Sequence, residues 1–265
     1  MGEWKSNIKV LSRVPKGARV AAADALATLM DEVTANNSIT AWGRLLGFAF
    51  GALQCPAKTS VSSPNQPSLA TKTRTQINDY MASQRLPVAP KPNEKSQKPT
   101  TDSPLTNLGK RVAAKIADCD IRGAVRIISS DDTCAGFTDE VRVALQAKHP
   151  PAPAGLVLPP PPDATTAPFQ ATKEQVLEAL KSFKPGSGAG PDGLRPGHLQ
   201  SLTSKGSGAA GERLKNSITS LCNLMCRGEV PEKVQPVLYG ATLCALSKKE
   251  GGIRPIASGG WRRRS

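Results

Sequence analysis

Two proline-rich tracts limit what this chain can fold into. The 265 residues include 23 prolines, which are concentrated in the stretches 55–104 and 150–170. Proline lacks a backbone N–H and has a fixed φ, so these tracts interrupt helices and sheets. We therefore predict a fold in pieces: a small helical segment over 1–54, a linker over 55–104, a helical region over 105–149, a proline-rich spacer over 150–170 and a last folded unit over 171–265.

The stretch 55–104 is rich in Pro, Ser, Thr, Gln, Asn and Lys and contains few large apolar residues. Such a composition buries too little apolar area to offset the entropy lost on ordering, so we predict a disordered, basic linker. Its excess of positive charge would allow contact with a phosphate backbone, although a soluble tether explains the composition more simply. The second tract, 150–170, is expected to be an extended spacer, with a ligand for a PxxP-binding partner as the alternative.

The charge of the whole chain favours a polyanionic partner. Its 35 Lys and Arg residues against 21 Asp and Glu residues give a formal net charge of +14. Nucleic acid is the simplest polyanion for such a protein to bind, although basic disordered tails would give the same charge. No apolar run approaches the roughly 20 residues that a membrane span needs, so we expect no membrane partner.

The six cysteines form no paired CxxC motifs, and the chain has only two histidines. This pattern argues against a zinc ribbon or finger. Cys222 and Cys226 would share one helix face, where they would either chelate a metal or, as the simpler interpretation, serve as small core residues. Unpaired cysteines suit a reducing compartment, so we expect an intracellular protein, nuclear or cytoplasmic.

Apolar residues at helical spacing predict most of the regular structure. The predicted helices cover 17–35, 42–53, 105–116, 121–128, 138–148, 172–183 and 214–225. In the second of these, Gly43, Gly47 and Gly51 recur at every fourth position, a spacing that permits close contact between helices. Thr172 and Gln175 form a predicted capping box at the start of the sixth helix.

Asp131 and Asp132 are adjacent carboxylates between the fourth and fifth predicted helices. Such a pair at the end of a strand would be a candidate magnesium site. The neighbouring Ser and Thr residues are more typical of a loop or helix cap, in which short polar side chains bond to free backbone amides. The sequence favours the cap and leaves the metal site as the alternative.

The stretch 185–199 reads PGSGAGPDGLRPGHL, a glycine-rich loop that leads into a helix. Gly188, Gly190 and Gly193 formally satisfy the GxGxxG dinucleotide fingerprint, but a helix is predicted before them where that motif requires a buried strand. No Lys-Ser or Lys-Thr follows, which excludes a Walker A loop. Two interpretations remain open: exposed amides that approach a phosphate backbone, or a turn that connects two helices.

Near the C-terminus, two short strands are predicted over 239–247 and 253–257, joined by a glycine-containing turn. Lys248 and Lys249 lie at the tip of this hairpin, and Arg254 lies at the start of the return strand. Lysine supplies a point charge and arginine a planar fork, so the hairpin would form a clamp for phosphates. A solvated surface turn is the alternative.

Three phrases follow one another in the second half of the chain: FKPGSGAGPDGLRPGHL, GEVPEKV at the end of a helix, and GATLCALSKKEGGIRPIASG. Together they resemble the start of the reverse transcriptase domain of non-LTR, LINE-like retrotransposons. The preceding LGKRVAAKIADCDIRGAVRIISSDDTCAGF and the proline tract are similar to the segment that leads into the polymerase in such polyproteins. The resemblance covers residues 105–261.

The resemblance implies an incomplete fingers subdomain of a right-hand polymerase, an α+β fold. For this chain we expect a mainly α structure with one short C-terminal β-hairpin and disordered linkers. In that family the GPDG loop belongs to the extension at the front of the fingers, where it contacts template RNA. This implicates Gly190, Pro191, Asp192 and Gly193 in template contact or in the architecture of the fingers.

The resemblance also assigns a role to the basic hairpin. In the family it is the fingers hairpin, whose cations face the triphosphate of the incoming nucleotide and the template. This implicates Lys248, Lys249 and Arg254 in binding nucleotide phosphates or template. The implied partner is an RNA or DNA template-primer.

The sequence departs from the family in its acidic residues. The family's catalytic carboxylates hold two magnesium ions and lie downstream of the fingers hairpin, in a palm strand and a Tyr-x-Asp-Asp turn. No such turn follows Ala257, and Asp131 and Asp132 precede the fingers. We therefore predict no catalytic residue, no metal or other cofactor bound by this chain, and no polymerase activity from it alone. Mg²⁺ belongs to the complete family enzyme, which a downstream polymerase portion would supply if the chain is incomplete.

The alternative function comes from another class of protein. The same charge and proline content suit a basic interaction or scaffold protein without an enzymatic role, which would use its proline tracts to bind partners.

Overall fold

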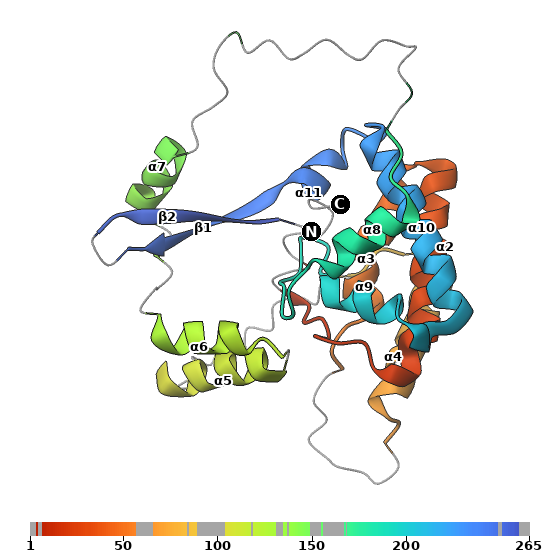
Figure 1. Cartoon of the computed structure of the whole chain (residues 1–265), viewed down its shortest axis with the longest axis horizontal. Helices are drawn as coiled ribbons and strands as arrows, with labels where there is room; N and C mark the ends of the chain where they lie inside the picture. Colours follow the sequence, from red (N-terminus) through yellow and green to blue (C-terminus); the bar gives the residue numbers. More distant parts are fainter. Residues whose placement is uncertain are drawn as a thin grey trace.

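The computed structural model of this chain describes residues 4, 7–56, 66–83, 85–88, 104–117, 119–130, 135–136, 138–148, 155, 167, 169–248 and 251–259. In chain order its elements are η1 (Lys16–Ala18), α2 (Arg19–Asn36), α3 (Ile39–Ala52), α4 (Leu69–Ser83), α5 (Pro104–Ala117), α6 (Ile121–Ser129), α7 (Asp139–Lys148), α8 (Lys173–Lys181), α9 (Pro196–Leu202), η3 (Lys205–Ser207), α10 (Gly208–Cys226), α11 (Gln235–Tyr239), β1 (Ala241–Ser247) and β2 (Ile253–Gly259). Figure 1 shows a mainly helical molecule with one antiparallel two-stranded hairpin. The predicted mainly α class with a C-terminal β-hairpin is confirmed.

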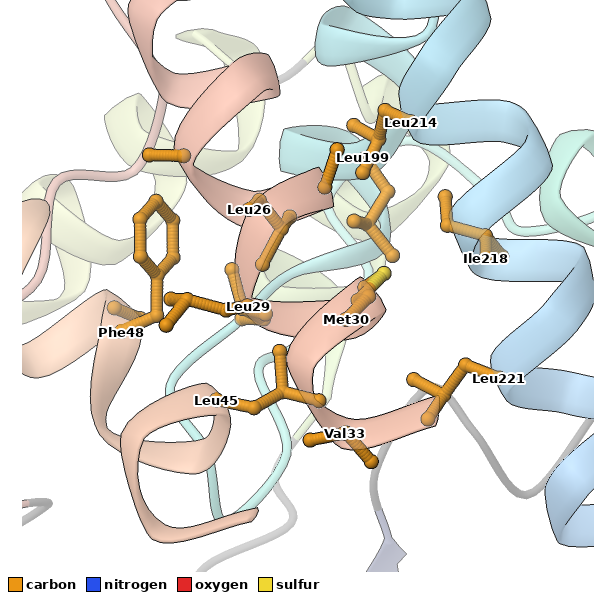
Figure 2. Packing of buried hydrophobic residues seen from close by; sticks show 14 of the residues in the cluster. Leu26, Leu29, Met30, Val33, Leu45, Phe48, Leu199, Leu214, Ile218 and Leu221 are labelled. Atoms are coloured by element: carbon orange, nitrogen blue, oxygen red, sulfur yellow. The ribbon is translucent and has the colours of Figure 1, made fainter. Parts of the chain in front are cut away.

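Helix α2 lies at the centre of the hydrophobic core. Its fully buried large residues are Leu26, Leu29, Met30 and Val33. Figure 2 shows α3 on one side of α2, contributing Leu45 and Phe48, and α10 on the other side. The contact between α2 and α10 is the most extensive one between helices of the described chain. The apolar face predicted for α10 supplies Leu214, Ile218 and Leu221 to this contact.

One hydrophobic cluster therefore joins segments from the two ends of the chain. It contains α2 and α3 from the stretch 1–54 and α8, α9 and α10 from the stretch 171–265. The expectation of separate pieces is wrong for these segments. The physical reason is that α10 has a continuous apolar stripe that needs cover, and the alanine-rich α2 lets another helix approach closely.

The predicted disordered linker is wrong over residues 69–83. Helix α4 occupies this stretch and packs on α2 and α3. It buries Thr73, Ile77 and Tyr80, which share one face at a spacing of three or four residues. Because so few residues of α4 are apolar, the average composition of the stretch conceals this narrow face. The predicted linker residues 57–65, 84 and 89–103 lie outside the described part of the chain.

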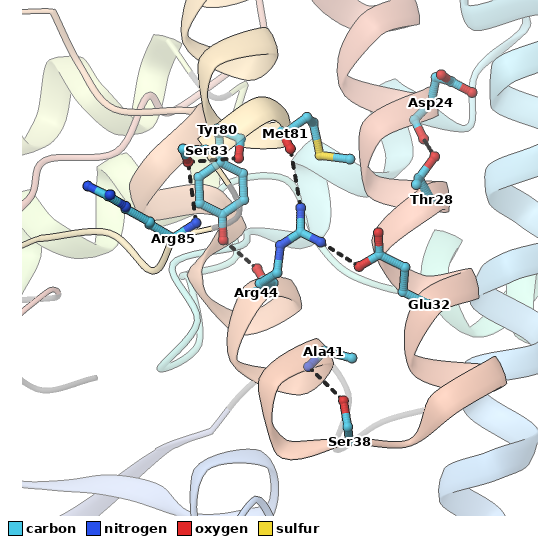
Figure 3. A network of polar contacts seen from close by, with 10 residues as sticks. All are labelled: Asp24, Thr28, Glu32, Ser38, Ala41, Arg44, Tyr80, Met81, Ser83 and Arg85. Carbon is cyan, nitrogen blue, oxygen red and sulfur yellow. Dashed lines mark hydrogen bonds and ion pairs between the residues drawn. The ribbon is translucent and has the colours of Figure 1, made fainter.

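The glycine repeat of α3 faces α4, and the predicted close contact between helices is confirmed. A Cβ atom on Gly47 would lie 2.8 Å from Cδ of Pro87, and a Cβ atom on Gly51 would overlap the ring of Tyr80. The Tyr80 hydroxyl donates a hydrogen bond to the carbonyl oxygen of Arg44 in α3 at 2.6 Å (Figure 3). Burial of this phenol raises the pKa of Tyr80 well above its ordinary value.

Arg44 connects three helices with its guanidinium group (Figure 3). Its Nη1 lies 2.7 Å from Oε2 of Glu32 in α2, and its Nη2 donates to the carbonyl oxygen of Met81 in α4 at 3.5 Å. The Arg44 residue is only 8% exposed. A buried charge is costly without its partner, so Glu32 fixes where α3 can sit on α2.

We expect the substitution Gly51→Ala to lower the free energy of unfolding by about 1–3 kcal/mol, the usual cost of overpacking. The added methyl group would displace the Tyr80 ring. Gly197→Ala in α9 is the matched control, because among the described residues no atom lies within 4 Å of its Cβ position. Losing a glycine there should raise stability by about 0.5–1 kcal/mol. Urea unfolding measures both values, and a shift of the same sign and size in both variants would contradict the close packing of α4 on α3.

The described residues between the two proline tracts form three helices, as predicted. Helices α5 and α6 pack on each other, and the break predicted between them is confirmed because the Asp120 carboxylate accepts a hydrogen bond from the Gly123 N–H of α6 at 2.9 Å. Thr138 caps α7 through a bond from the Val141 N–H to its hydroxyl. The apolar stripe of α6 is more than half exposed at all three positions: Ile121, Val125 and Ile128.

Candidate nucleic-acid interface

The hairpin formed by β1 and β2 carries two of the predicted basic residues, Lys248 directly after β1 and Arg254 in β2. The strands are antiparallel, with Leu246 opposite Arg254. The Lys248 N–H donates to the carbonyl oxygen of Gly252 at 3.1 Å. Gly251 and Gly252 have φ values of +86° and +81°, which glycine adopts without strain. The Gly-Gly pair in the sequence is therefore what allows the tip to close here.

Lys248 and Arg254 lie on the same face of the hairpin. Side chains alternate along a strand, and residues opposite each other share a face. Arg254 is opposite Leu246, which is two residues before Lys248, so the two cations are diagonal neighbours. Both side chains are exposed to solvent. Lys249, the third predicted residue of this group, lies outside the described residues, as do 262–264.

Few contacts hold the hairpin against the rest of the described chain. Helix α7 packs on β2, and the Ala135 N–H donates to the carbonyl oxygen of Ala245 in β1 at 3.0 Å. Ala245 is buried, but Leu243 and Ile256 remain exposed. In Figure 1 the two strands extend away from the helical core. The described residues on either side of the turn, Lys248, Gly251 and Gly252, are exposed to solvent.

The GPDG loop, by contrast, is built into the helical core between α8 and α9. Three of its residues are buried: Gly190, Asp192 and Gly193. Pro191 is half-buried. Gly193 has a φ of +72°, and a Cβ atom there would lie 2.9 Å from Cζ of Phe50 in α3. The Asp192 carboxylate accepts a hydrogen bond from the Leu194 N–H at 3.2 Å.

This burial favours an architectural role for the GPDG loop over exposed amides that approach phosphate. The loop follows helix α8, which agrees with the reason for rejecting the dinucleotide fingerprint. Because the loop packs on α3 and the hairpin on α7, the two groups of predicted site residues belong to different parts of the structure.

A third group of basic residues, which the sequence analysis missed, surrounds a cleft beside this loop. The cleft has a volume of about 410 Å³ and is formed by the segment 12–19, the segment 184–187 and α9. Its cationic residues are Arg13, Arg19, Lys184 and Arg195. They are up to 182 positions apart in the sequence, so no local pattern predicts that they meet.

One buried histidine holds the walls of this cleft together. His198 of α9 is fully buried, and its Nδ1 accepts a hydrogen bond from the Arg195 N–H at 3.3 Å. The other nitrogen, Nε2, therefore carries the proton, and it lies 2.8 Å from the carbonyl oxygen of Leu11 and 3.1 Å from that of Ser12. The signal in the sequence was a histidine beside an Arg-Pro pair, which gave no indication of these distant partners.

The predicted acidic and cysteine candidates do not form a site in the described structure. Asp131 and Asp132 lie outside the described residues. Cys222 is buried in the core cluster and Cys226 is exposed, which fits the simpler interpretation of Cys222. Within the described ranges there is no group of three or more His, Cys, Asp and Glu residues placed to hold a metal ion. None of the described helices is both long and apolar enough to span a membrane.

Comparisons with known proteins give no relative to set beside this geometry. No family model, no curated protein and no solved structure matches the chain.

Proposed function

We propose that this chain binds nucleic acid through strand phosphates, with the tip of the β1–β2 hairpin as a clamp. The observation that carries the proposal is the pair Lys248 and Arg254, which are exposed on one face of the hairpin. An ammonium group beside a guanidinium group presents several N–H donors to the oxygens of a phosphate. The net charge of +14 adds long-range attraction for any polyanion.

The chain is, in this proposal, a fingers portion of a reverse transcriptase of the non-LTR retrotransposon type. The support comes from the order of three phrases in the sequence, the last of which forms the hairpin. The partner would be an RNA or DNA template-primer, and Mg²⁺ would serve the complete enzyme. The proposal assigns no catalytic step to the residues of this chain.

The triple substitution K248A/K249A/R254A is expected to weaken binding to single-stranded RNA by roughly tenfold or more at about 0.1 M salt. Each lost phosphate contact also reduces the dependence on salt, so the slope of log K against log salt should become shallower by about 2. Fluorescence anisotropy over a salt series measures both quantities.

The matched control for this experiment is R74A/K205A/K233A, which removes the same charge from exposed positions on α4, η3 and the segment before α11. If the control weakens binding as much as the hairpin variant, attraction is due to net charge and the clamp is wrong. If the wild-type chain does not bind RNA at all, the proposed function is wrong.

A further inference from the structure

The cleft beside the GPDG loop has the charge of an anion site. Arg13 and Lys184 are exposed, and Arg19 and Arg195 are half-buried, so all four are within reach of a ligand. Among the described residues that line the cleft there is no carboxylate. The side chains that line the cleft therefore carry an excess of positive charge.

One acidic residue at the rim of the cleft, Asp120, is paired with a lysine. A Cβ atom on Gly186 would lie 3.2 Å from the Asp120 side chain, next to the rim of the cleft. The Lys115 Nζ donates to Asp120 Oδ2 at 2.9 Å and to the carbonyl oxygen of Gly186 at 3.3 Å. The bond from Lys115 and the Gly123 N–H lower the pKa of the Asp120 carboxyl. The acid and the lysine thus offset each other, and the charge of the cleft itself remains.

Hydrogen bonds of the buried His198 also fix the backbone that surrounds the cleft. The buried His198 contacts the carbonyl oxygens of Leu11 and Ser12 on one side and the Arg195 N–H on the other. Arg13 follows Ser12 directly, so the same imidazole fixes the backbone under Arg13 and under Arg195. The backbone segments that carry two arginines 182 positions apart in the sequence are thereby held beside one cleft. Such preorganisation lowers the entropy lost on binding.

The chemistry of the lining indicates which part of a nucleic acid would enter. Guanidinium forks match phosphate oxygens, and the cleft volume of about 410 Å³ lies in the range of sites for small molecular units. No aromatic side chain is found among the described lining residues, so stacking on a base is not provided there. The cleft is suited to the sugar-phosphate backbone, which has no sequence information.

We infer that this cleft binds the phosphate backbone of a single-stranded nucleic acid, independently of sequence, at a site separate from the hairpin tip. It is a second contact, formed by the N-terminal segment together with the Lys184–Ser187 turn and α9. The N-terminal stretch, which showed no chemistry in the sequence, thereby becomes part of the binding surface.

The test compares R13Q/K184Q with the matched control R74Q/K233Q in the full chain. Both variants remove two positive charges from exposed side chains. The probe is a fluorescein-labelled oligouridine of about 12 nucleotides, a length within the usual site sizes for single strands. We expect R13Q/K184Q to weaken binding roughly tenfold and to make the salt slope shallower by about 1.4, and the control to have a clearly smaller effect. Equal losses in both variants, or no loss in R13Q/K184Q, would overturn the inference.

Two further comparisons are needed. One distinguishes the loss of charge from a disturbed fold, and the other distinguishes binding at the cleft from binding at the hairpin. The conservative variant R13K/K184R keeps both charges and should retain the affinity of the wild type; a loss as large as that of R13Q/K184Q would contradict a phosphate contact. R13Q/K184Q is also made in the K248A/K249A/R254A background. If the hairpin variant loses binding and the cleft variant does not, the proposed function stands and this inference fails. If only the cleft variant loses binding, this inference stands and the hairpin clamp is wrong.

Inorganic phosphate distinguishes a strand from a free anion, since both offer the same oxygens. Titration of phosphate into the wild type at constant ionic strength is followed by calorimetry and by displacement of the labelled RNA. We expect displacement only at concentrations far above those of the oligonucleotide. If phosphate binds tightly, and R13Q/K184Q abolishes that binding while RNA affinity is unchanged, the cleft is a small-anion site and binding of a strand there is wrong.

Discussion

The substitution Leu29→Ala is expected to lower the free energy of unfolding by about 2–5 kcal/mol. Leu29 is fully buried at the middle of α2, where Figure 2 shows it between the side chains of neighbouring helices. Removing its branched end leaves a cavity that the surrounding helices fill only in part, so the lost transfer energy is joined by lost packing. A loss of this size is a large fraction of the stability of an ordinary domain.

Val20→Ala is the control on the same helix. Val20 is the second residue of α2 and is 55% exposed. Because most of its surface is already in water, the change should stay within about 0.5 kcal/mol. Urea unfolding followed by circular dichroism measures both variants. Losses of similar size at Leu29 and Val20 would show that α2 does not lie at the centre of the core.

A chain of residues 169–265 alone is expected to have no cooperative unfolding transition. In the full chain, α2 covers Leu214, Ile218 and Leu221 of α10, and each of these buried side chains contributes about 1.5–3 kcal/mol. Without α2 this face is open to water. Co-expression with residues 1–88, which contain α2, α3 and α4, should restore a single transition, and the two pieces should purify together.

This experiment tests whether the N-terminal and C-terminal segments share one hydrophobic core. Calorimetry of the separate and combined pieces gives the measurement. A sharp transition in residues 169–265 alone would mean that the C-terminal segment folds independently and that the boundary expected near residue 54 divides two units after all.

Local signals in the sequence were sufficient for the elements whose stability is local. The capping box of α8 is confirmed, since Thr172 and Gln175 bond to each other's backbone as expected. The hairpin was found from its Gly-Gly turn, and α10 from its apolar stripe. In each case the residues that determine the structure are close together in the sequence. The local sequence pattern is therefore enough to predict the element.

The sequence failed where the determining contact is distant. Nothing within α2 indicates that its alanine-rich surface receives α10, because complementarity of two surfaces is not a property of either one. α4 was missed for a related reason: its buried Tyr80 packs against Gly47 and Gly51 of α3, which lie outside the stretch 55–104. The basic cleft depends on the contact between His198 and the distant Leu11, so no local pattern in the sequence brings its four cations together.

The central claim is that strand phosphates contact the hairpin tip, and lysine acetylation of the unmodified chain tests it directly. Mass spectrometry gives the acetylation rate of each lysine with and without single-stranded RNA. The account predicts that RNA slows the reaction strongly at Lys248 and Lys249 and leaves the exposed Lys233 nearly unchanged. Equal slowing at Lys233, or no slowing at the hairpin while RNA is bound, would contradict it.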